Sequence, residues 1–436
     1  MLNETHDPTL LSWVDSANTV ESDFPIQNLP FGVYRPIGSA AGFRVGVAIG
    51  EYVLDISAVH DAGLLHDLAA EAAVHCRAGD LNALMALSPA HWSALRLSLS
   101  RILRAGNRSE AASRALTPIA DIELALPVMI GDFTDFFSSV HHARRTGSLV
   151  RPDMPLFPNY DWVPIAYHGR ASSVQLGDSP VVRPLGQIVA PGESEPRFAP
   201  TEKLDYELEL GIFYGNADAT RPRLSLDDAE DHIFGVCLLN DWSARDIQSW
   251  EAKPLGPFLA KSFATTISPW IVTWEALAPF RVPWKRDVEA PRPLAYLSSE
   301  RNDSYGALDI TLDAWIETAA MRATHQGAQH ICETNARHAF WTVPQMLVHH
   351  TSNGCRLRPG DLIGTGTQSG PALQESACLL ELTEGGKRHV PLHNGETRLY
   401  FEDGDTVTLT GRCRRDSWRS IGFGQCSATI QPPQYD

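Results

Sequence analysis

Short apolar runs, separated by glycine, proline and aromatic residues, fill the chain from about residue 128 to its end. Branched and aromatic residues in runs of this length are typical of β-strands. The runs that we predict as strands are YELELGIF, HIFGVCLLN, WIVTW, LDITLDAWI, LIGTGT, CLLEL, TVTLTG and FGQCSATIQ. Few long helical patterns come between them. The pattern predicts a strand-rich unit of roughly 300 residues, built as a rolled or packed sheet.

The N-terminal part mixes strand and helix patterns. Residues 43–57 predict two short strands joined at Gly50-Glu51, because glycine suits the first turn position of a type II′ hairpin. Residues 64–104 have helical periodicity, and Ser88 followed by Pro89 marks the start of a helix. One apolar stripe of this helix consists of Trp92, Leu95, Leu99 and Ile102.

These two patterns divide the chain into two expected domains. A length of 436 residues allows two or three domains of ordinary size. We place the boundary near Leu126-Pro127, which gives an N-terminal domain of residues 1–127 and a larger domain of residues 128–436. The polar segment of residues 1–25 is expected to be a loosely held arm. The expected fold class is mainly β, of the α+β type.

The charge balance excludes several classes of function. The chain has 36 lysines and arginines against 52 aspartates and glutamates, a net charge of −16. A broad surface for nucleic acid or anionic lipid needs excess basic residues, so we expect neither partner. The sequence contains no run of 18 apolar residues, and its first residues are acidic. We therefore expect no membrane span and no signal peptide.

The seven cysteines are scattered, and none forms a C-x-x-C pair. This spacing gives no support to a zinc ribbon or to thioredoxin chemistry. A reduced, cytoplasmic location fits an odd number of cysteines better than secretion does. We interpret the cysteines as structural residues.

The segment LDYELELGIF carries three carboxylates on alternate positions. Side chains alternate between the two faces of a strand, so Asp205, Glu207 and Glu209 share one face and the apolar residues share the other. Adjacent carboxylates on one face repel each other unless a cation lies between them. Oxygen ligands suit Mg²⁺ or Ca²⁺. A solvated acidic face is the alternative that this segment alone leaves open.

Two further segments predict polar side chains on shared helix faces. In NDWSARDIQSWE, Asn240 or Asp241 could cap a helix, and Arg245 and Gln248 lie four and seven residues after Asp241. An exposed helix with an ordinary ion pair is the alternative. In GDFTDFFSSVHHARR, Asp135 and His142 are two helical turns apart, which would suit a metal ligand and a general base. A structural histidine is the alternative there.

The remaining motifs are weaker. Lys261 and Thr265 lie four residues apart in GPFLAKSFATTISPW, and a lysine near carboxylates could balance charge or stabilise an oxyanion. A surface lysine is the alternative. The glycine-rich segment LRPGDLIGTGTQSG lacks the Lys-Ser/Thr ending of a P-loop, so we expect a tight hairpin or a loop against substrate. No G-x-S-x-G nucleophile elbow is present.

Taken together, these segments resemble the fumarylacetoacetase family. The resemblance covers about nine tenths of the chain, and its most specific stretches are IGDFTDFFSS, YHGRASS, HIFGVCLLNDWSARDIQSWE, PLGPFLAKSF with TTISPW, and NGCRLRPGDLIGTGT. The resemblance implies a small SH3-like N-terminal barrel followed by a larger β-roll catalytic domain. It also implies a homodimer, a divalent cation (Ca²⁺ or Mg²⁺) and no organic cofactor.

The resemblance also assigns roles to individual residues. The implied ligands of the divalent cation are Asp135, Glu207, Glu209 and Asp241. The implied base is His142, oriented by Glu381. The side chains implied to line the developing oxyanion are Arg245, Gln248 and Lys261. A second cation site is implied at Asp241, Lys261 and Thr265. The positions implied to contact substrate include Arg151, Tyr167, Gln248 and Thr367.

Two positions depart from the family pattern. Phe137 stands where the pattern DFYSS has tyrosine, and Ala252 stands where the pattern WEY has tyrosine. Both tyrosines contact substrate in the family. Their replacement affects the contacts to the carboxylates of the substrate and leaves the catalytic and metal positions unchanged.

The activity implied by the resemblance is hydrolysis of the carbon–carbon bond of 4-fumarylacetoacetate, a small diketo-acid of tyrosine and phenylalanine degradation. A water molecule activated by the histidine–glutamate pair would attack the carbonyl. Three alternatives remain open: another acylpyruvate or diketo-acid hydrolase of the superfamily, a glycosidase with paired carboxylates, and a metal-binding module without catalysis.

Overall fold

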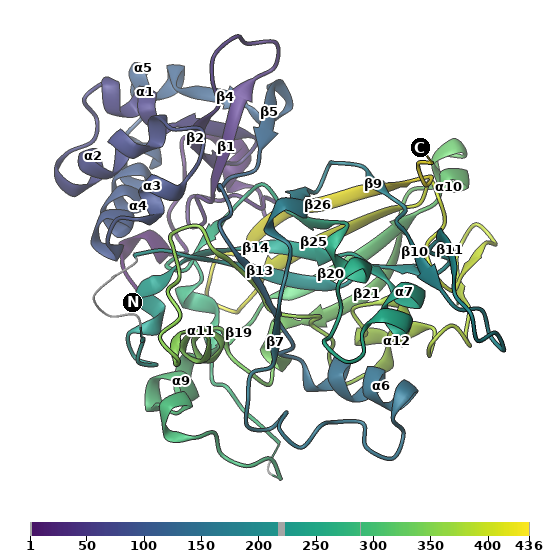
Figure 1. The fold of residues 1–436 in the computed structure, drawn as a ribbon. Helices are drawn as coiled ribbons and strands as arrows, with labels where there is room; N and C mark the ends of the chain where they lie inside the picture. The colour runs from purple at the N-terminus through teal and green to yellow at the C-terminus, as the bar shows by residue number, and fades with distance from the viewer. Residues whose placement is uncertain (1, 217–222, 288, 436) are drawn as a thin grey trace.

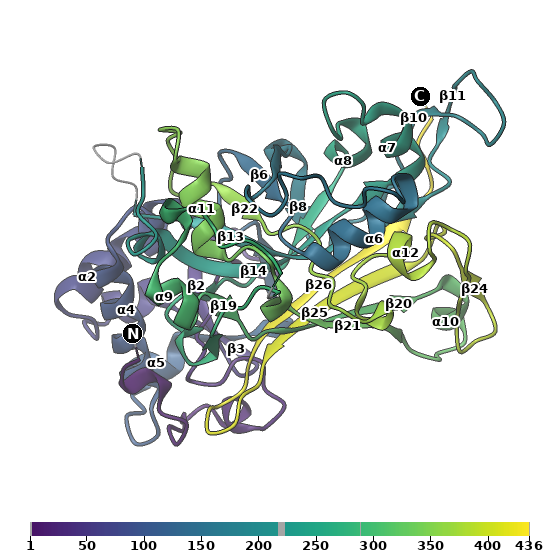
Figure 2. The ribbon, with the colours of Figure 1, turned by 90° about the horizontal axis from the view of Figure 1, so that it is seen from below.

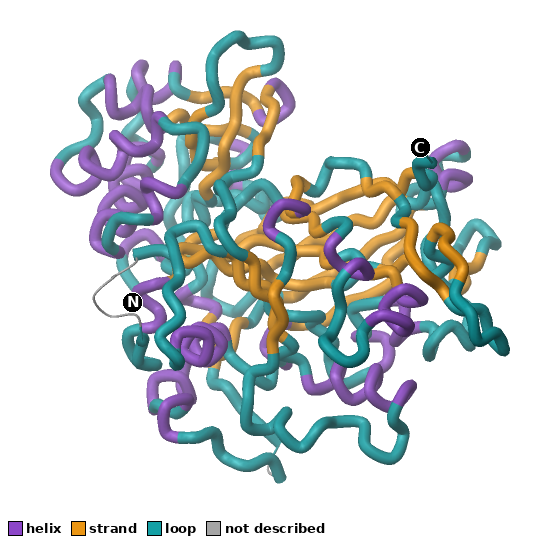
Figure 3. Tube along the Cα trace, viewed as in Figure 1, coloured by secondary structure: helices purple, strands orange, loops and turns teal. Residues whose placement is uncertain are grey.

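The computed structural model describes residues 2–216, 223–287 and 289–435, and the chain folds into helices and several sheets. Figures 1 and 3 show an N-terminal part with its helices on one side, next to a larger body that contains most of the strands. Within the described ranges, no helix is both long and apolar enough to cross a membrane.

A five-stranded antiparallel sheet with strand order β4-β3-β2-β1-β5 forms the N-terminal part. Its strands are β1 (Phe31–Pro36), β2 (Arg44–Ile49), β3 (Tyr52–Asp55), β4 (Leu116–Pro118) and β5 (Ile122–Ala125). Its helices are α1 (Ile56–Asp61), α2 (Asp67–Val74), α3 (Asn82–Met85), α4 (Pro89–Leu103) and α5 (Glu110–Arg114).

The predicted hairpin and helix of this part are confirmed. Strands β2 and β3 pair directly, and Gly50 between them has a φ of +55°, as the first position of a type II′ turn requires. Helix α4 begins at Pro89, but the Ser88 hydroxyl bonds to the ring of His91 and not to a backbone N–H.

The expectation of a loose arm at residues 1–25 is wrong. Thr5 and His6 are buried, and the Nε2 atom of His6 lies 2.8 Å from the carbonyl oxygen of Glu275, far along the chain. Ser12 is also buried and donates a hydrogen bond to the carbonyl of Leu103. Polar side chains hold this segment in place, so its lack of apolar periodicity misled the prediction.

The larger body is organised around an eight-stranded sheet, with order β7-β6-β22-β13-β14-β16-β8 and with β17 paired to β14. Its strands are β6 (Phe133–Phe136), β7 (Ala166–His168), β8 (Val174–Leu176), β13 (Leu208–Tyr214), β14 (Ile233–Asp241), β16 (Thr265–Ile267), β17 (Val272–Thr273) and β22 (Leu362–Gly364). Every residue of β13 and β14 is buried, because both faces of this part of the sheet are covered.

A second sheet of five strands lies beside the first, in the order β21-β20-β25-β26-β9. Its strands are β9 (Val181–Val182), β20 (Thr311–Glu317), β21 (Gln329–Asn335), β25 (Thr406–Cys413) and β26 (Ile421–Gln431). The two-stranded pairs are β10 (Leu185–Ile188) with β11 (Arg197–Pro200), β12 (Leu204–Asp205) with β15 (Ser243–Ala244), β18 (Arg281–Val282) with β19 (Ala307–Leu308), and β23 (Val390–Pro391) with β24 (Thr397–Arg398).

Short helices surround these sheets (Figure 2). They are α6 (Val140–Val150), α7 (Arg245–Glu251), α8 (Leu259–Ser262), α9 (Glu300–Tyr305), α10 (Ala319–Ala323), α11 (Val343–Thr351) and α12 (Leu379–Leu382). Helix α12 corrects one prediction, since CLLEL was expected to be a strand. The five residues of CLLEL are too short a window for helical periodicity to be distinguished from a buried strand.

The apolar core crosses between the two parts of the chain. One cluster joins N-terminal residues such as Leu54 and Leu99 to Phe213 of β13, Phe234 of β14 and Leu362 of β22. A second cluster fills the other side of the body. The central strands therefore carry a packed layer on each face, and the polar residues described next lie at their ends.

Candidate active site

Three carboxylates from neighbouring strands of the eight-stranded sheet converge at one place. Asp135 lies in β6, Glu209 in β13 and Asp241 at the last position of β14. All three are buried, and one oxygen from each lies within 4.8 Å of the others. Strand β22 runs between β6 and β13, so the sheet order itself brings together residues that are up to 106 positions apart in sequence.

Two glycines make room for this carboxylate cluster. Gly364, at the end of β22, lies opposite Asp135, and a Cβ atom there would come within 2.5 Å of the Asp135 Oδ1 atom. Gly366 has a φ of +75°, which favours glycine. Its N–H donates to Asp135 Oδ1 at 3.2 Å and to Glu209 Oε2 at 2.9 Å. The segment LIGTGT, which begins with strand β22, thus lies against the carboxylate cluster.

A lysine and two hydroxyl groups surround the outer side of the cluster. The Lys261 Nζ atom lies 2.5 Å from Glu207 Oε2 and 2.7 Å from Asp241 Oδ2. Thr265 donates to Asp241 Oδ1 at 3.0 Å, and the Tyr167 hydroxyl donates to Asp241 Oδ2 at 2.7 Å. Tyr167, Thr265 and Lys261 therefore all contact Asp241, and Lys261 also joins Asp241 to Glu207.

An arginine balances the acidic face from the other side. Arg245, the first residue of α7, donates from Nε to Asp205 Oδ2 at 2.8 Å and pairs through Nη1 with Glu207 Oε1 at 2.7 Å. The same Nη1 atom donates to Gln248 Oε1 at 3.1 Å. The Nη2 atom of Arg245 is buried and has no hydrogen-bond partner among the described residues.

The protein neighbours of the cluster do not supply enough positive charge to keep all of its carboxyl groups ionised. Burial, together with the nearby charge of Asp241, raises the pKa of Asp135 to about 8. Burial and the charge of Asp135 raise the pKa of Glu209 well above its ordinary value. Burial opposes ionisation of Glu207 as well, but Lys261 and Arg245 outweigh it and hold its pKa below the ordinary value.

These features fit a hard divalent cation. The donor atoms are carboxylate oxygens, the ligands that Mg²⁺ and Ca²⁺ prefer. Glu209 Oε1 is buried without a hydrogen-bond partner among the described residues, and a buried polar oxygen without a partner is costly. A cavity of 280 Å³ reaches the cluster, and its lining includes Tyr167, Asp241, Lys261 and Thr265.

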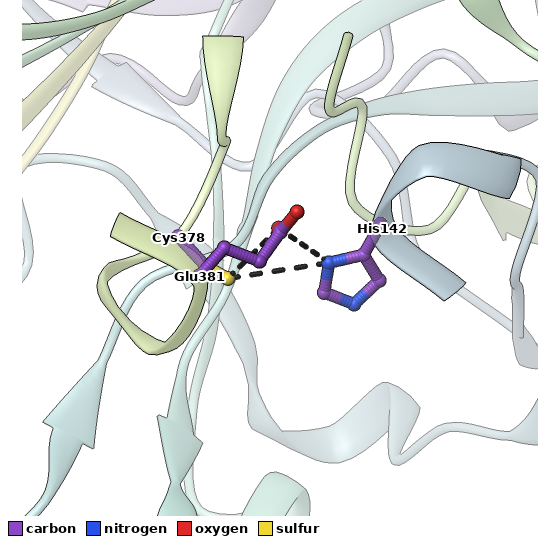
Figure 4. A group of neighbouring side chains, drawn as sticks. All are labelled: His142, Cys378 and Glu381. Carbon is purple, nitrogen blue, oxygen red and sulfur yellow. Dashed lines mark hydrogen bonds and ion pairs between the residues drawn. The ribbon is translucent and has the colours of Figure 1, made fainter. Parts of the chain in front are cut away.

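A histidine and a glutamate form a second buried group (Figure 4). His142, in α6, and Glu381, in α12, are 239 positions apart, yet the His142 Nδ1 atom lies 2.6 Å from Glu381 Oε2. The predicted hydrogen bond is confirmed. The other ring nitrogen of His142 points away from Glu381 in the figure. The charge of His142 also lowers the pKa of Glu207, which links this pair to the carboxylate cluster.

Several donors converge on Glu381. Ser369 Oγ lies 2.7 Å and Cys378 Sγ 3.1 Å from Glu381 Oε2, and Arg145 Nη1 lies 3.1 Å from Oε1. Burial alone would raise the pKa of Glu381, but His142 and the hydrogen bonds outweigh it and lower the pKa to about 2. Burial raises the pKa of the Cys378 thiol well above its ordinary value, so the sulfur carries a proton to donate.

Comparison with known proteins identifies the origin of this arrangement. The family model described as "Fumarylacetoacetate (FAA) hydrolase C-terminal" matches residues 133–431, and the model "Fumarylacetoacetase N-terminal" matches residues 27–127. The chain belongs to the fumarylacetoacetase family. This family supplies the relatives and the folds described next.

Curated fumarylacetoacetases match almost the whole chain. The protein of Oryza sativa is 44% identical over 94% of this chain and 95% of its own length, and that of Arabidopsis thaliana is 43% identical over 97% and 99%. The human protein is 41% identical over 94% and 97%. Among solved structures, the fumarylacetoacetate hydrolase of Exiguobacterium antarcticum has the same fold, with a TM-score of 0.51 and 16% identity over 93% of this chain and 99% of that one.

Two predictions of shared helix faces are wrong, although the residues lie in segments that match the family. These were Asp241 with Arg245, and Asp135 with His142. Asp241 ends strand β14 and Arg245 begins helix α7, whose N-cap residue is Ala244 without a side-chain cap. Asp135 is likewise in strand β6, while His142 is in α6. Helical spacing therefore does not explain either pair, and tertiary pairing of strands brings each residue to the site.

Phe137 and Ala252 depart from the family pattern, and Arg151 and Thr367 are two of the implied substrate positions. Each of the four has different neighbours. The Phe137 ring meets the His142 ring edge-on, with centroids 5.3 Å apart. Arg151 stacks its guanidinium over the Phe157 ring at 4.0 Å. Thr367 is buried, and its hydroxyl has no hydrogen-bond partner among the described residues. Ala252 follows α7 and is half-buried.

Three side chains that contact Glu381 were not assigned a role from the sequence: Arg145, Ser369 and Cys378. Asp205, predicted to share an acidic strand face with Glu207 and Glu209, accepts hydrogen bonds from the backbone N–H groups of residues 379 and 380 as well as from Arg245. Arg145 is three residues after His142 and Cys378 is three before Glu381, so helical spacing could have found both once the dyad was assumed.

Proposed function

We propose that this protein hydrolyses the carbon–carbon bond of 4-fumarylacetoacetate to give fumarate and acetoacetate, as its relatives' name indicates. The observation that carries the proposal is the hydrogen-bonded His142–Glu381 pair beside a cluster of buried carboxylates. The identity of 41–44% to curated fumarylacetoacetases over nearly the whole chain supports it.

In this proposal His142 is the general base. Its Nδ1 side faces Glu381, so the second ring nitrogen is the atom that takes a proton from water. Glu381 fixes the tautomer and stabilises the imidazolium that forms, the role of the carboxylate in a catalytic triad. The attacking group is water, so no covalent intermediate forms on the protein.

A divalent cation, Ca²⁺ or Mg²⁺, would be held by Asp135, Glu207, Glu209 and Asp241, with Lys261 and Thr265 around Asp241. When bound, it would polarise the substrate's carbonyl oxygens. Lys261 and Arg245 offset the excess charge of the carboxylates and fix their orientation. No organic cofactor is part of the proposal.

Unused N–H donors remain near the substrate carbonyl oxygen that would become negatively charged when water attacks. An ammonium group has three N–H bonds, and Lys261 uses two of them on Glu207 and Asp241. The Nη2 group of Arg245 is buried without a partner among the described residues, and Gln248 lies against the same guanidinium. Donors of this kind each contribute about 10²–10³ in rate.

The proposed substrate contacts include Arg151, Tyr167, Gln248 and Thr367. The Thr367 hydroxyl has no partner among the described residues and can bond to a ligand. Phe137 and Ala252 stand where the family pattern has tyrosines. We propose that the remaining polar groups compensate for the two lost hydroxyls.

The finer architectural predictions remain part of this proposal. They are an SH3-like N-terminal barrel (residues 1–127), a β-roll catalytic domain (residues 128–436), a homodimer and a cytoplasmic location. The two family models, which end at residue 127 and begin at residue 133, support the proposed boundary.

The deciding experiment is an assay on fumarylacetoacetate before and after exhaustive chelation with EDTA. We expect turnover that disappears with EDTA and returns with Ca²⁺ or Mg²⁺. A preference of at least tenfold for an acylpyruvate in the same assay would favour the alternative diketo-acid hydrolase. The observation that favours this alternative is that Phe137 and Ala252 replace two tyrosines of the family pattern. Full activity in EDTA would contradict the proposed cation, and it is the result expected of a metal-free hydrolase.

A further inference from the structure

A second pocket, of 380 Å³, lies beside the N-terminal end of α6, outside the carboxylate cluster. None of its lining residues belongs to the proposed catalytic or cation sites. The apolar part of its lining is Val140, Val282, Pro283 and Phe340. The charged and titratable part is His141, Lys285, Arg286, Asp287, Arg337 and His338. Three permanent cations against one carboxylate give this pocket a positive charge in a chain whose net charge is −16.

Arg286 is packed among aromatic rings, and some of its N–H donors have no partner among the described residues. Its guanidinium lies 3.9 Å from the ring centre of Phe340 and 4.1 Å from that of Trp341. The Nη1 atom donates to the carbonyls of Asp161 and Pro291, at 3.0 and 2.9 Å. The Nε and Nη2 atoms are buried and have no hydrogen-bond partner among the described residues. Buried guanidinium donors without partners are costly, so a ligand that accepts from them is favoured.

The rim of the pocket supplies two exposed cations, Lys285 and Arg337. Arg337 forms one long ion pair, from its Nη1 atom to Asp309 Oδ1 at 3.8 Å, and most of its side chain remains exposed. His141 and His338 face each other with ring centroids 6.2 Å apart. Asp287 is the carboxylate in the lining. The cations therefore occupy both the aromatic wall and the solvent edge of the pocket.

We propose that this pocket binds a small dicarboxylate. One carboxylate would enter beside Arg286 and accept hydrogen bonds from its unpartnered Nε and Nη2 atoms, since a planar carboxylate matches the edge of a planar guanidinium. The hydrocarbon part would contact Val140, Val282 and Phe340. The second carboxylate would lie at the rim near Lys285 and Arg337. A pocket of this size holds a small organic ligand, and a compact phosphate could reach only one of the two charged regions.

The pocket and the proposed catalytic site are separated by an aromatic layer and joined by one helix. Tyr160 packs on Phe340 at 5.5 Å and on Phe137 at 6.0 Å, and its hydroxyl donates to the Phe137 carbonyl. Consecutive residues of α6 face the two regions, with His141 lining the pocket and His142 bonded to Glu381. A ligand in the pocket is therefore distinct from substrate but contacts the helix that carries the proposed base.

The test is isothermal titration calorimetry of the full-length protein with succinate, in a buffer of low ionic strength. We expect saturable binding of one succinate per chain. The double variant Lys285→Gln/Arg337→Gln should weaken it at least tenfold, and Arg286→Met should weaken it further. The matched control Arg197→Gln/Arg388→Gln, which removes two exposed cations elsewhere, should leave the affinity unchanged. Inorganic phosphate should bind at least tenfold more weakly than succinate.

Several outcomes would overturn the proposal. Absence of binding up to about 10 mM succinate would do so, since small dianions held by several cations bind in the millimolar range or better. Equal affinity in the Lys285/Arg337 variant and in the control would place succinate elsewhere, including the catalytic cavity. Equal affinity for phosphate would exclude a site that needs two separated carboxylates. If Arg286→Met does not fold, the rim variant still decides the question.

Discussion

Glu209 and Glu381 are two buried glutamates of the same site with opposite electrostatics. Glu209 and Glu381 are 0% and 2% exposed, so burial opposes ionisation of both. The pKa of Glu381 nevertheless falls to about 2, whereas that of Glu209 rises well above its ordinary value. The difference lies in their neighbours. Glu381 accepts from His142, Ser369, Cys378 and Arg145, while Glu209 accepts from one backbone N–H, at Gly366, and borders other carboxylates.

The comparison separates a glutamate whose oxygens both have donors from one with an oxygen that has none among the described residues. The surroundings of Glu381 already satisfy its charge, which suits its proposed role of orienting His142. The surroundings of Glu209 disfavour its ionised form and leave one oxygen without a partner among the described residues, and a bound cation would relieve both conditions. Burial alone therefore does not indicate the role of a carboxylate, and its donors do.

The largest expected effect is the contrast between two matched substitutions, Glu381→Gln and Glu209→Gln. In EDTA, Glu381→Gln should lower the free energy of unfolding by about 3 kcal/mol, because it removes one partner of a buried ion pair. Glu209→Gln should change the same free energy by less than about 1 kcal/mol, because the raised pKa of Glu209 favours its neutral form without a cation, and glutamine resembles the neutral acid. Chemical denaturation measures both. Equal losses would contradict the distinction between the two sites.

A second prediction removes the base. His142→Ala should lower kcat by at least about 10², the lower range for loss of general-base catalysis, while the content of divalent cation stays normal. The matched control is His141→Ala, the preceding residue of α6, which lines the other pocket and should keep wild-type turnover. Wild-type turnover in His142→Ala would mean that another residue is the base.

The third prediction concerns the two positions where tyrosines are missing. A hydrogen bond to a charged group contributes roughly 1.5–3 kcal/mol, so an uncompensated loss would raise KM about tenfold or more. If neighbouring groups compensate, as we propose, Phe137→Tyr with Ala252→Tyr should leave the KM for fumarylacetoacetate nearly unchanged. Steady-state kinetics measures this, and a KM that falls tenfold would require another natural substrate.

A fourth prediction concerns stability in acid. Because the pKa of Glu381 is depressed from 4.5 to about 2, its ionised form stabilises the fold above pH 4.5. That contribution is lost as the pH falls from 4.5 towards 2, by at most about 1.4 kcal/mol per pH unit. Glu381→Gln should remove this part of the pH dependence. Unfolding midpoints measured between pH 6 and pH 3 in both proteins test it, and parallel curves would contradict the assignment.

The sequence predicted much of the local structure. Alternating and continuous apolar runs predicted β13, β14, β20, β25 and β26, because side-chain periodicity is a local property. It failed where the run was too short, as in α12, and where polar contacts replace an apolar face, as at His6. The prediction of a His142–Glu381 contact came from family resemblance and not from local pattern.

The site shows what each level determines. The sequence by itself determined which family the chain belongs to and named the carboxylates and the proposed base, because residue types and motifs are read from it directly. Only the tertiary structure decided that Asp135 and Asp241 meet at the ends of strands and not on helices, that Arg145 and Cys378 reach Glu381, and that Glu209 Oε1 has no partner among the described residues. The physical reason is that charge balance in a buried site depends on groups far apart in sequence, and strand pairing across β6, β22, β13 and β14 is what brings them within bonding distance.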